Sequence, residues 1–247
     1  MVKYRFSALI IAALIAIPAS FGQSKSSDSA PAPADDASLQ ESVDLMIMRE
    51  SSRLDTAEQK LAALAIISTL LEGGSTNDEI RITLERLSLE GTNYQAREKG
   101  RIKNDFPEVR RQAARHLGAF NSEEARKALI RVCSSDNEPM VLQEAIRSLG
   151  LIGDDTDGEA VGAIVWVATK YHNATAPDNL IAIAAIDALD KIAKNNKNVR
   201  QEAFLLLIKI SEGSYSPPVR EKAKQTIMDV RNIIANSAKE KKQGQPR

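Results

Sequence analysis

The chain has 247 residues, a hydrophobic fraction of 43% and a formal net charge of +0. This apolar content is enough for a folded core and excludes a chain that is disordered throughout. Aromatic residues make up only 4% of the sequence, so Ala, Leu, Ile and Val must build the core, which favours closely packed helices over a sheet. The neutral charge balance gives no indication of nucleic acid as a partner.

Residues 1–22 have the layout of a secretory signal. Lys3 and Arg5 precede an apolar run at residues 8–17, and small residues offer cleavage positions shortly before Gln23. The run is short for a bilayer span. We therefore expect a cleaved, periplasmic or secreted product without a membrane span, with a retained anchor as the alternative.

The composition divides the remaining chain into three segments. Residues 23–38 are rich in Ser, Pro, Ala and Asp without apolar periodicity, which predicts a flexible linker. Residues 238–247 are polar and predict a tail that frays from the preceding helix. Between them, in residues 39–237, apolar residues recur three and four apart and short Gly, Asn, Asp, Ser and Pro clusters interrupt them. This pattern predicts an all-α domain of helices and turns with almost no β-structure.

An internal repeat is visible when the helical segments are compared. PEVRRQAARHLG begins at Pro107 and PMVLQEAIRSLG begins at Pro139, 32 residues later. The same template returns at Pro217 and, more loosely, around Ala57 and Ala185. Periods of this length with paired helices are typical of an α-solenoid, and we expect four to five helical hairpins.

Each repeated position has a physical role. Proline suits the first turn of a helix, so Pro107, Pro139 and Pro217 should mark where the first helices of the hairpins begin. Gly118 and Gly150 are expected to be left-handed residues at helix ends. Small residues that allow close helix packing are predicted at Ala113, Ala145 and Ala223, and apolar residues one turn later at Leu117, Leu149 and Ile227.

The motif Asp136-x-x-Pro-x-Val, then Ala145 and Leu149-Gly150-x-Ile152-Gly153-Asp154, resembles the HEAT repeat subtype of phycobilin-lyase-like proteins. The best match covers about residues 105–168, and flanking copies extend it to about 55–234. Leu142 stands where the subtype usually has Arg, and the copy around Ala185 lacks the Leu-Gly turn. Because residues 199–203 also fit the template, the helix pairing near residues 177–234 could be shifted by one.

Residues 91–105, GTNYQAREKGRIKND, break the repeat period with a basic insertion. Such an insertion projects from one face of a solenoid, where it either contacts a partner or tolerates sequence drift.

Few residues could carry chemistry. His116 and His172 lie far apart in the sequence, the lone Cys133 is expected to be a buried apolar residue, and the Gly73-Gly74 pair is expected to form a turn. The acidic run at residues 154–159 lacks the spacing of a calcium loop, so we expect it to cap the helix that follows. We therefore expect no enzymatic activity, cofactor or metal.

Charge is distributed unevenly, with basic residues crowding 97–131 and acidic residues crowding 136–190. This polarity could steer a partner, promote head-to-tail self-association or be an ordinary solvated surface. Second helices generally line the binding face of HEAT-like solenoids. The candidate partner-binding residues are Lys127, Arg131, Trp166, Arg110 and Arg111. Burial between repeats is the expectation for Trp166, with an interface anchor as the alternative.

These patterns lead to one hypothesis and two alternatives. The chain is expected to be a non-enzymatic, extracytoplasmic scaffold that binds another protein on the solenoid surface. The alternatives are an enzyme or enzyme accessory, since some relatives of this repeat subtype assist chromophore attachment, and a self-assembling structural subunit.

Overall fold

The computed structural model describes residues 36–172, 175–196 and 200–243, so the predicted signal and nearly all of the predicted linker lie outside the described residues. The described part contains ten helices and one two-stranded hairpin, which confirms the all-α prediction. The helices are α1 (Asp36–Arg53), α2 (Ala57–Glu72), α3 (Asp78–Ser88), α4 (Pro107–Leu117), α5 (Glu123–Ser135), α6 (Pro139–Ile152), α7 (Glu159–Lys170), α8 (Asn179–Asn196), α9 (Gln201–Glu212) and α10 (Pro217–Gln243). None of them is long and apolar enough to cross a bilayer.

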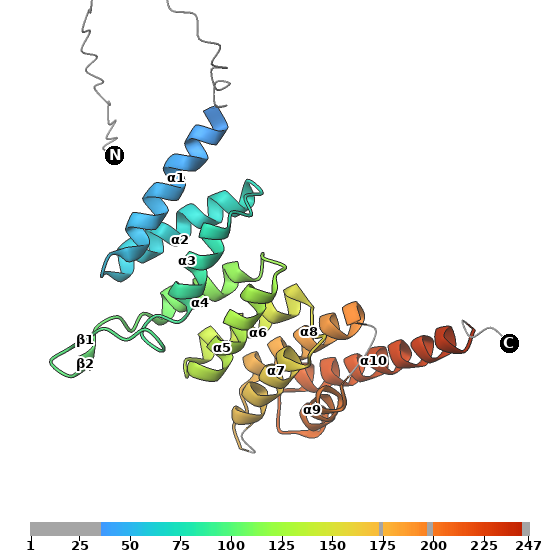
Figure 1. The fold of residues 1–247 in the computed structure, drawn as a ribbon. Coiled ribbons are helices and arrows are strands. Elements are labelled where there is room, and N and C mark those ends of the chain that lie inside the picture. Colours follow the sequence, from blue (N-terminus) through green and yellow to red (C-terminus); the bar gives the residue numbers. More distant parts are fainter. Residues whose placement is uncertain (1–35, 173–174, 197–199, 244–247) are drawn as a thin grey trace, which may run out of the picture. The chain divides into compact units, whose positions relative to one another are not determined.

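The helices form two rows, which Figure 1 shows from one side. In the first row, α2, α4, α6, α8 and α10 each pack against the next member. In the second row, α1, α3, α5, α7 and α9 do the same. The chain alternates between the rows, which is the arrangement of an α-solenoid. Because α9 lies in the second row, the helix pairing near the C-terminal end follows the repeat without a shift.

Local sequence signals explain where the helices begin. Pro107, Pro139 and Pro217 are the first residues of α4, α6 and α10, as predicted. Elsewhere a side chain caps the first turn: the Ser122 hydroxyl accepts a hydrogen bond from the Ala125 amide at 3.2 Å, and the Asn77 side chain accepts one from the Glu79 amide at 2.8 Å. A side-chain cap gives a hydrogen-bond partner to an amide that has none inside the helix, and a proline has no amide hydrogen that would need one.

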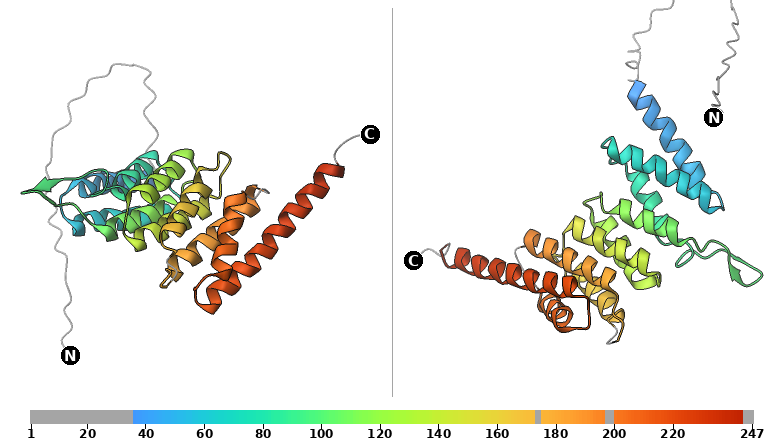
Figure 2. Two further views of the ribbon diagram at one scale, coloured as in Figure 1. Left: turned by 90° about the horizontal axis from the view of Figure 1, so that it is seen from below. Right: turned by 180° about the vertical axis from the view of Figure 1, so that it is seen from behind.

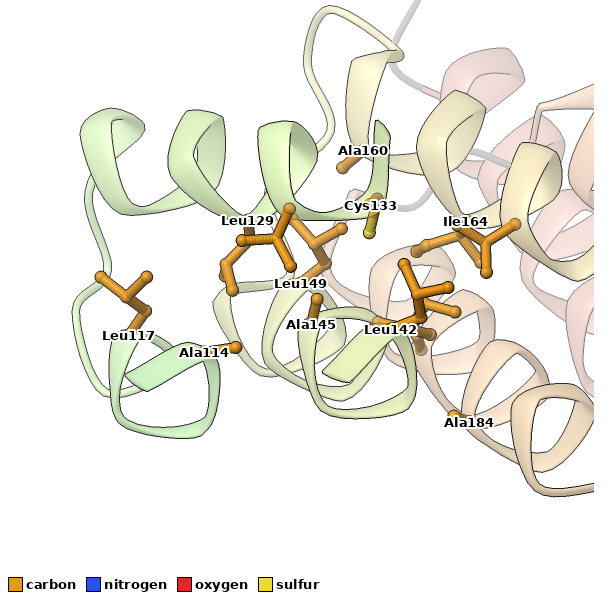
Figure 3. Close-up of a cluster of buried hydrophobic side chains, with 14 of the residues drawn as sticks. Ala114, Leu117, Leu129, Cys133, Leu142, Ala145, Leu149, Ala160, Ile164 and Ala184 are labelled. Atoms are coloured by element: carbon orange, nitrogen blue, oxygen red, sulfur yellow. The ribbon is translucent and has the colours of Figure 1, made fainter. Parts of the chain in front are cut away.

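The predicted seam lies at the centre of the core, and Figure 3 shows part of it between α4, α5, α6, α7 and α8. Its members are fully buried with one exception, because Ile227 is only partly buried on α10. The fully buried positions are Ala113, Leu117, Ala145, Leu149 and Ala223.

Gly118 and Gly150 have a different role from the predicted one. Gly118 has a right-handed φ of −62°, Gly150 lies inside α6, and the left-handed end of α6 is Gly153 with φ 70°. A Cβ at Gly118 would lie 2.8 Å from the Ser148 hydroxyl oxygen, and one at Gly150 would lie 2.6 Å from Cα of Ala188. These glycines are needed where neighbouring first-row helices approach each other closely.

Two element boundaries differ from the sequence prediction. α1 begins at Asp36, inside the predicted linker, and α10 continues to Gln243, beyond the end predicted at residue 237. Figure 2 shows the C-terminal part of α10 running past α8 and α9. Helix α10 therefore continues through residues 238–243, although these residues lack apolar periodicity.

The basic insertion forms a small hairpin that projects beside α3 and α4 (Figure 1). Strand β1 (Arg97–Glu98) pairs antiparallel with β2 (Arg101–Ile102), and Lys99 (φ 50°) and Gly100 (φ 81°) make the turn. Positive φ at both turn residues matches the twist of a tight hairpin. The Asn104 side chain closes the base, accepting from the Ala96 amide at 2.8 Å and donating to the Tyr94 carbonyl at 2.7 Å.

Candidate functional site

The outward side of α5 carries two of the predicted partner-binding residues. Lys127 and Arg131 are exposed one turn apart, whereas Leu129 and Val132 are fully buried. A helix places residues four apart on the same face. The predicted polar face of α5 is therefore confirmed, and it is open to solvent.

Trp166 lies on the outward side of α7 and is 49% exposed, so its expected burial between repeats is wrong. Ile164 and Val167 point into the core and are fully buried, and Trp166 lies two residues from Ile164, about 200° around the helix. Gly162, one turn earlier, is exposed on the same side. The alternative expectation, an aromatic side chain available to a partner, matches this geometry.

A groove separates the C-terminal end of α5 from α7 beside Trp166. Its volume is about 440 Å³, and a second hollow of about 470 Å³ lies along α7 at Gly162, Trp166 and Lys170. A Cβ added at Gly162 would meet no atom within 4 Å, so this glycine keeps the groove floor low without being needed for helix packing. The groove is lined by Ile130, Cys133, Ser134, Glu159, Gly162, Ala163 and Trp166.

Positive charge lies close to this groove. Nζ of Lys170 is 5.3 Å from the Trp166 ring centroid and donates a hydrogen bond to the Asn137 side-chain oxygen at 2.7 Å. Lys127 pairs with Glu123 at 2.5 Å, and this bond raises the pKa of the Lys127 ammonium. A cation held over an aromatic face is favourable by about 0.5–1 kcal/mol at an exposed site, which helps to hold Trp166 and Lys170 in place.

Arg110 is buried, so its side chain does not lie on the surface where the sequence placed a partner-binding residue. Its side chain is 2% exposed, and its Nε donates to Oδ2 of Asp136 at 2.7 Å. Its Nη1 also donates to Oδ1 of Asp105 at 2.7 Å and to the carbonyl of Glu90 at 3.2 Å. Burial of a guanidinium requires such partners, and these contacts join α4 to the insertion and to the end of α5.

Arg111 lies apart from the α5–α7 groove. It is on the first-row helix α4, where it pairs with Glu108 at 2.6 Å and approaches Glu144 of α6 at 3.9 Å. The structure thus brings Trp166 together with Ile130 and Ser134 of α5, while Arg110 and Arg111 lie on α4, away from the groove.

The acidic run before α7 caps that helix, as predicted, and also binds arginines. Asp155 accepts the Val161 amide and Asp157 accepts the Glu159 amide, both at 3.0 Å. Arg126 pairs with Asp157 at 2.5 Å and Arg200 pairs with Asp155 at 2.9 Å. Because these acids are neutralised within the chain, the charge polarity of the sequence is weaker at the surface.

The residues considered for chemistry lie on different elements. Cys133 is fully buried on α5, as predicted, and burial raises the pKa of its thiol to about 12. His116 is on α4, and Nδ1 of His172, in the turn after α7, lies 2.9 Å from the Tyr215 hydroxyl. Within the described ranges, no group of three or more His, Cys, Asp or Glu side chains could hold a metal ion.

Trp166 was a candidate partner-binding residue from the sequence, but the groove beside it was not predicted. Ile130 and Ser134 form its wall from α5, and their relation to α7 depends on how the two helices pack. The available signal was Gly162, an exposed small residue one turn before an exposed aromatic residue.

Comparison with protein families agrees with this architecture. Residues 96–171 match a family model described as HEAT repeats, which covers the hairpin and helices α4 to α7. No curated protein matches the chain. The two helical rows make the described part an α-solenoid, and residues 96–171 within it are similar to HEAT repeats. Stacked helices of this kind offer extended surfaces to other proteins.

Proposed function

We propose that the chain is a non-enzymatic scaffold that binds another protein through the groove between α5 and α7. The observation that carries this proposal is Trp166, which is 49% exposed beside an open groove of about 440 Å³. A large exposed aromatic side chain next to a concave apolar surface is the usual form of an interface hot spot.

The chemistry of the groove specifies the partner segment. Ile130, Ala163 and Trp166 offer apolar surface, so the partner would insert an apolar side chain above Gly162. Lys170 provides positive charge beside Trp166, which favours acidic residues next to that anchor. Such a segment would displace water from Trp166 and gain charge pairs at the rim.

The arrangement of potentially reactive groups supports a binding role over catalysis. The Cys133 thiol is buried with its pKa raised to about 12, so little reactive thiolate forms near neutral pH. In the part of the chain that the structure describes, His172 contacts Tyr215 and has no partner arrangement of the kind that activates a nucleophile.

We further propose that residues 1–22 direct export and that the scaffold works outside the cytoplasm of a bacterial-type cell. The basic start, short apolar run and small residues support this proposal. We also propose that the repeats are of the phycobilin-lyase-like subtype, on the basis of the motif from Asp136 to Asp154. Intact mass of the chain recovered from the periplasm tests export: a first residue near Gln23 is expected, and recovery only from the cytoplasm would refute it.

Selection of peptides from a display library tests the binding proposal. We expect the chain to enrich peptides with an aromatic or aliphatic anchor beside Asp or Glu. Trp166→Ala should weaken their binding by at least about tenfold, the effect of a hot-spot residue. Leu151→Ala is the matched control, because Leu151 is 58% exposed on the first-row helix α6. Equal binding by the two variants would reject the groove as the binding site.

A further inference from the structure

Buried charge pairs hold the base of the hairpin formed by β1 and β2. Glu90, shortly after α3, pairs with Lys60 of α2 at 2.9 Å, and their side chains are 9% and 3% exposed. Asp105, shortly before α4, pairs with the buried Arg110 at 2.7 Å. Both ends of the insertion are thus attached to the helices. Because these two carboxylates already have partner cations, they do not neutralise the charge at the tip of the hairpin.

The tip of the hairpin, residues 97–103, is basic and open to solvent. Four cations and one carboxylate lie within these seven residues, and all five side chains are exposed: Arg97, Glu98, Lys99, Arg101 and Lys103. Within the described ranges, the only ion pair of the tip joins Lys103 to Glu98 at 3.3 Å. The other three cations are therefore available to an anionic partner.

The cations surround the tip instead of sharing one face. Successive residues of a strand point to opposite faces, and residues paired across a hairpin share a face. The register pairs Arg97 with Ile102. It pairs Glu98 with Arg101, so the two arginines lie on opposite faces. Lys99 lies in the turn, at the end of the hairpin. A flat patch on a protein covers one of these faces, whereas a layer of anionic groups that the tip enters contacts all of them.

The free positive charge does not continue from the tip onto the first half of α4. Arg110 is engaged by Asp105 and Asp136, and Arg111 pairs with Glu108 at 2.6 Å. A linear polyanion such as a nucleic acid binds along a basic track. A headgroup layer needs cations only where the tip enters it, so charge confined to the tip favours a bilayer.

We propose that the hairpin tip binds the phosphate headgroups of an anionic phospholipid bilayer and holds the solenoid at a membrane surface. Clusters of Lys and Arg attract anionic lipids, and each cation that reaches the headgroups strengthens binding by about fivefold. The hairpin projects beside α3 and α4 (Figure 1), so its tip can reach a flat surface. None of residues 97–103 lines the α5–α7 groove, so this proposal does not rest on the proposed binding of a partner protein there.

Co-sedimentation of the chain, as recovered from its producing cell, with lipid vesicles tests the proposal. We expect binding to vesicles that contain phosphatidylglycerol at about 0.1 M salt, and loss of binding near about 0.5 M salt, because salt screens exposed charges. Vesicles of phosphatidylcholine alone should bind little. Equal binding to both kinds of vesicle would overturn the proposal, since an apolar segment and not the basic tip would then carry it.

Charge variants locate the contact. Lys99→Asn combined with Arg101→Gln removes two tip cations and should weaken binding by about 25-fold. Asparagine at position 99 tolerates the positive φ of the turn. Lys191→Gln combined with Lys209→Gln removes the same charge from exposed positions on α8 and α9, and should leave binding nearly unchanged. Equal losses in the two double variants would overturn the proposal.

Single variants on opposite faces of the hairpin test how the tip is bound. Arg97→Gln and Arg101→Gln should each weaken binding to phosphatidylglycerol vesicles by about fivefold if headgroups surround the tip. Loss in only one of them would indicate a contact with one face and contradict entry among the headgroups. Soluble polyglutamate that binds as tightly as the vesicles, with the same dependence on Lys99 and Arg101, would assign the tip to an acidic protein instead.

Discussion

Arg110 and Asp136 form an ion pair in which both side chains are only 2% exposed. The carboxylate also accepts hydrogen bonds from the Asn137 amide at 2.8 Å and the Glu138 amide at 3.0 Å. These bonds hold the turn before α6. The ion pair therefore links α4 to the turn between α5 and α6. The net stability of such a pair is small, but the loss of one partner leaves a buried charge uncompensated.

Arg110→Ala should therefore lower the free energy of unfolding by about 3–5 kcal/mol, measured by urea denaturation. Arg115→Ala on the same helix is the control, because Arg115 is exposed and surface changes usually stay within about 0.5 kcal/mol. Equal stability of the two variants would show that the ion pair does not hold the turn.

Cys133 provides a pH-dependent probe of the core. Its pKa rises from 9.0 to about 12 because burial disfavours the thiolate. The unfolded chain releases the proton first, so this contribution to stability is complete below pH 9 and is lost as pH rises toward about 12. A thiol reagent at pH 8 should react no faster than the chain unfolds. Rapid stoichiometric labelling of the folded chain would contradict the buried position.

At the scale of single helices, two glycines in neighbouring elements differ in their surroundings. Gly150 on α6 meets Ala188 of α8, whereas Gly162 on α7 faces open space. Gly150→Ala should destabilise the chain by about 1–3 kcal/mol through overpacking. Gly162→Ala should stabilise it by about 0.5–1 kcal/mol, since alanine is the better helix former. Thermal unfolding of both variants checks this, and changes of the same sign would contradict the packing described for α6 and α8.

Local features of the helices could be predicted from the sequence, and features that depend on packing could not. Proline at a first turn and alanine in a seam follow from residue type and spacing, which is why Pro107, Pro139 and Ala145 were placed correctly. Gly150 was misassigned because its contact, Ala188, lies on another helix. Arg110 was misassigned because its partner Asp136 is 26 residues away, and charge alone does not distinguish a buried ion pair from a surface patch.

At the scale of the whole molecule, the two rows give the helical unit distinct surfaces. The second row exposes Trp166 and the groove proposed to bind a partner protein, whereas the first row exposes Leu151, the control position, on α6.

Site-specific photo-cross-linking in the producing cell tests the proposed binding role most directly. A photoreactive side chain at Ser134, an exposed residue that lines the groove, should capture a discrete protein of another sequence. That adduct should disappear when Trp166→Ala is present and persist with Leu151→Ala. No adduct at Ser134, or an adduct that survives the loss of Trp166, would contradict partner binding in the α5–α7 groove.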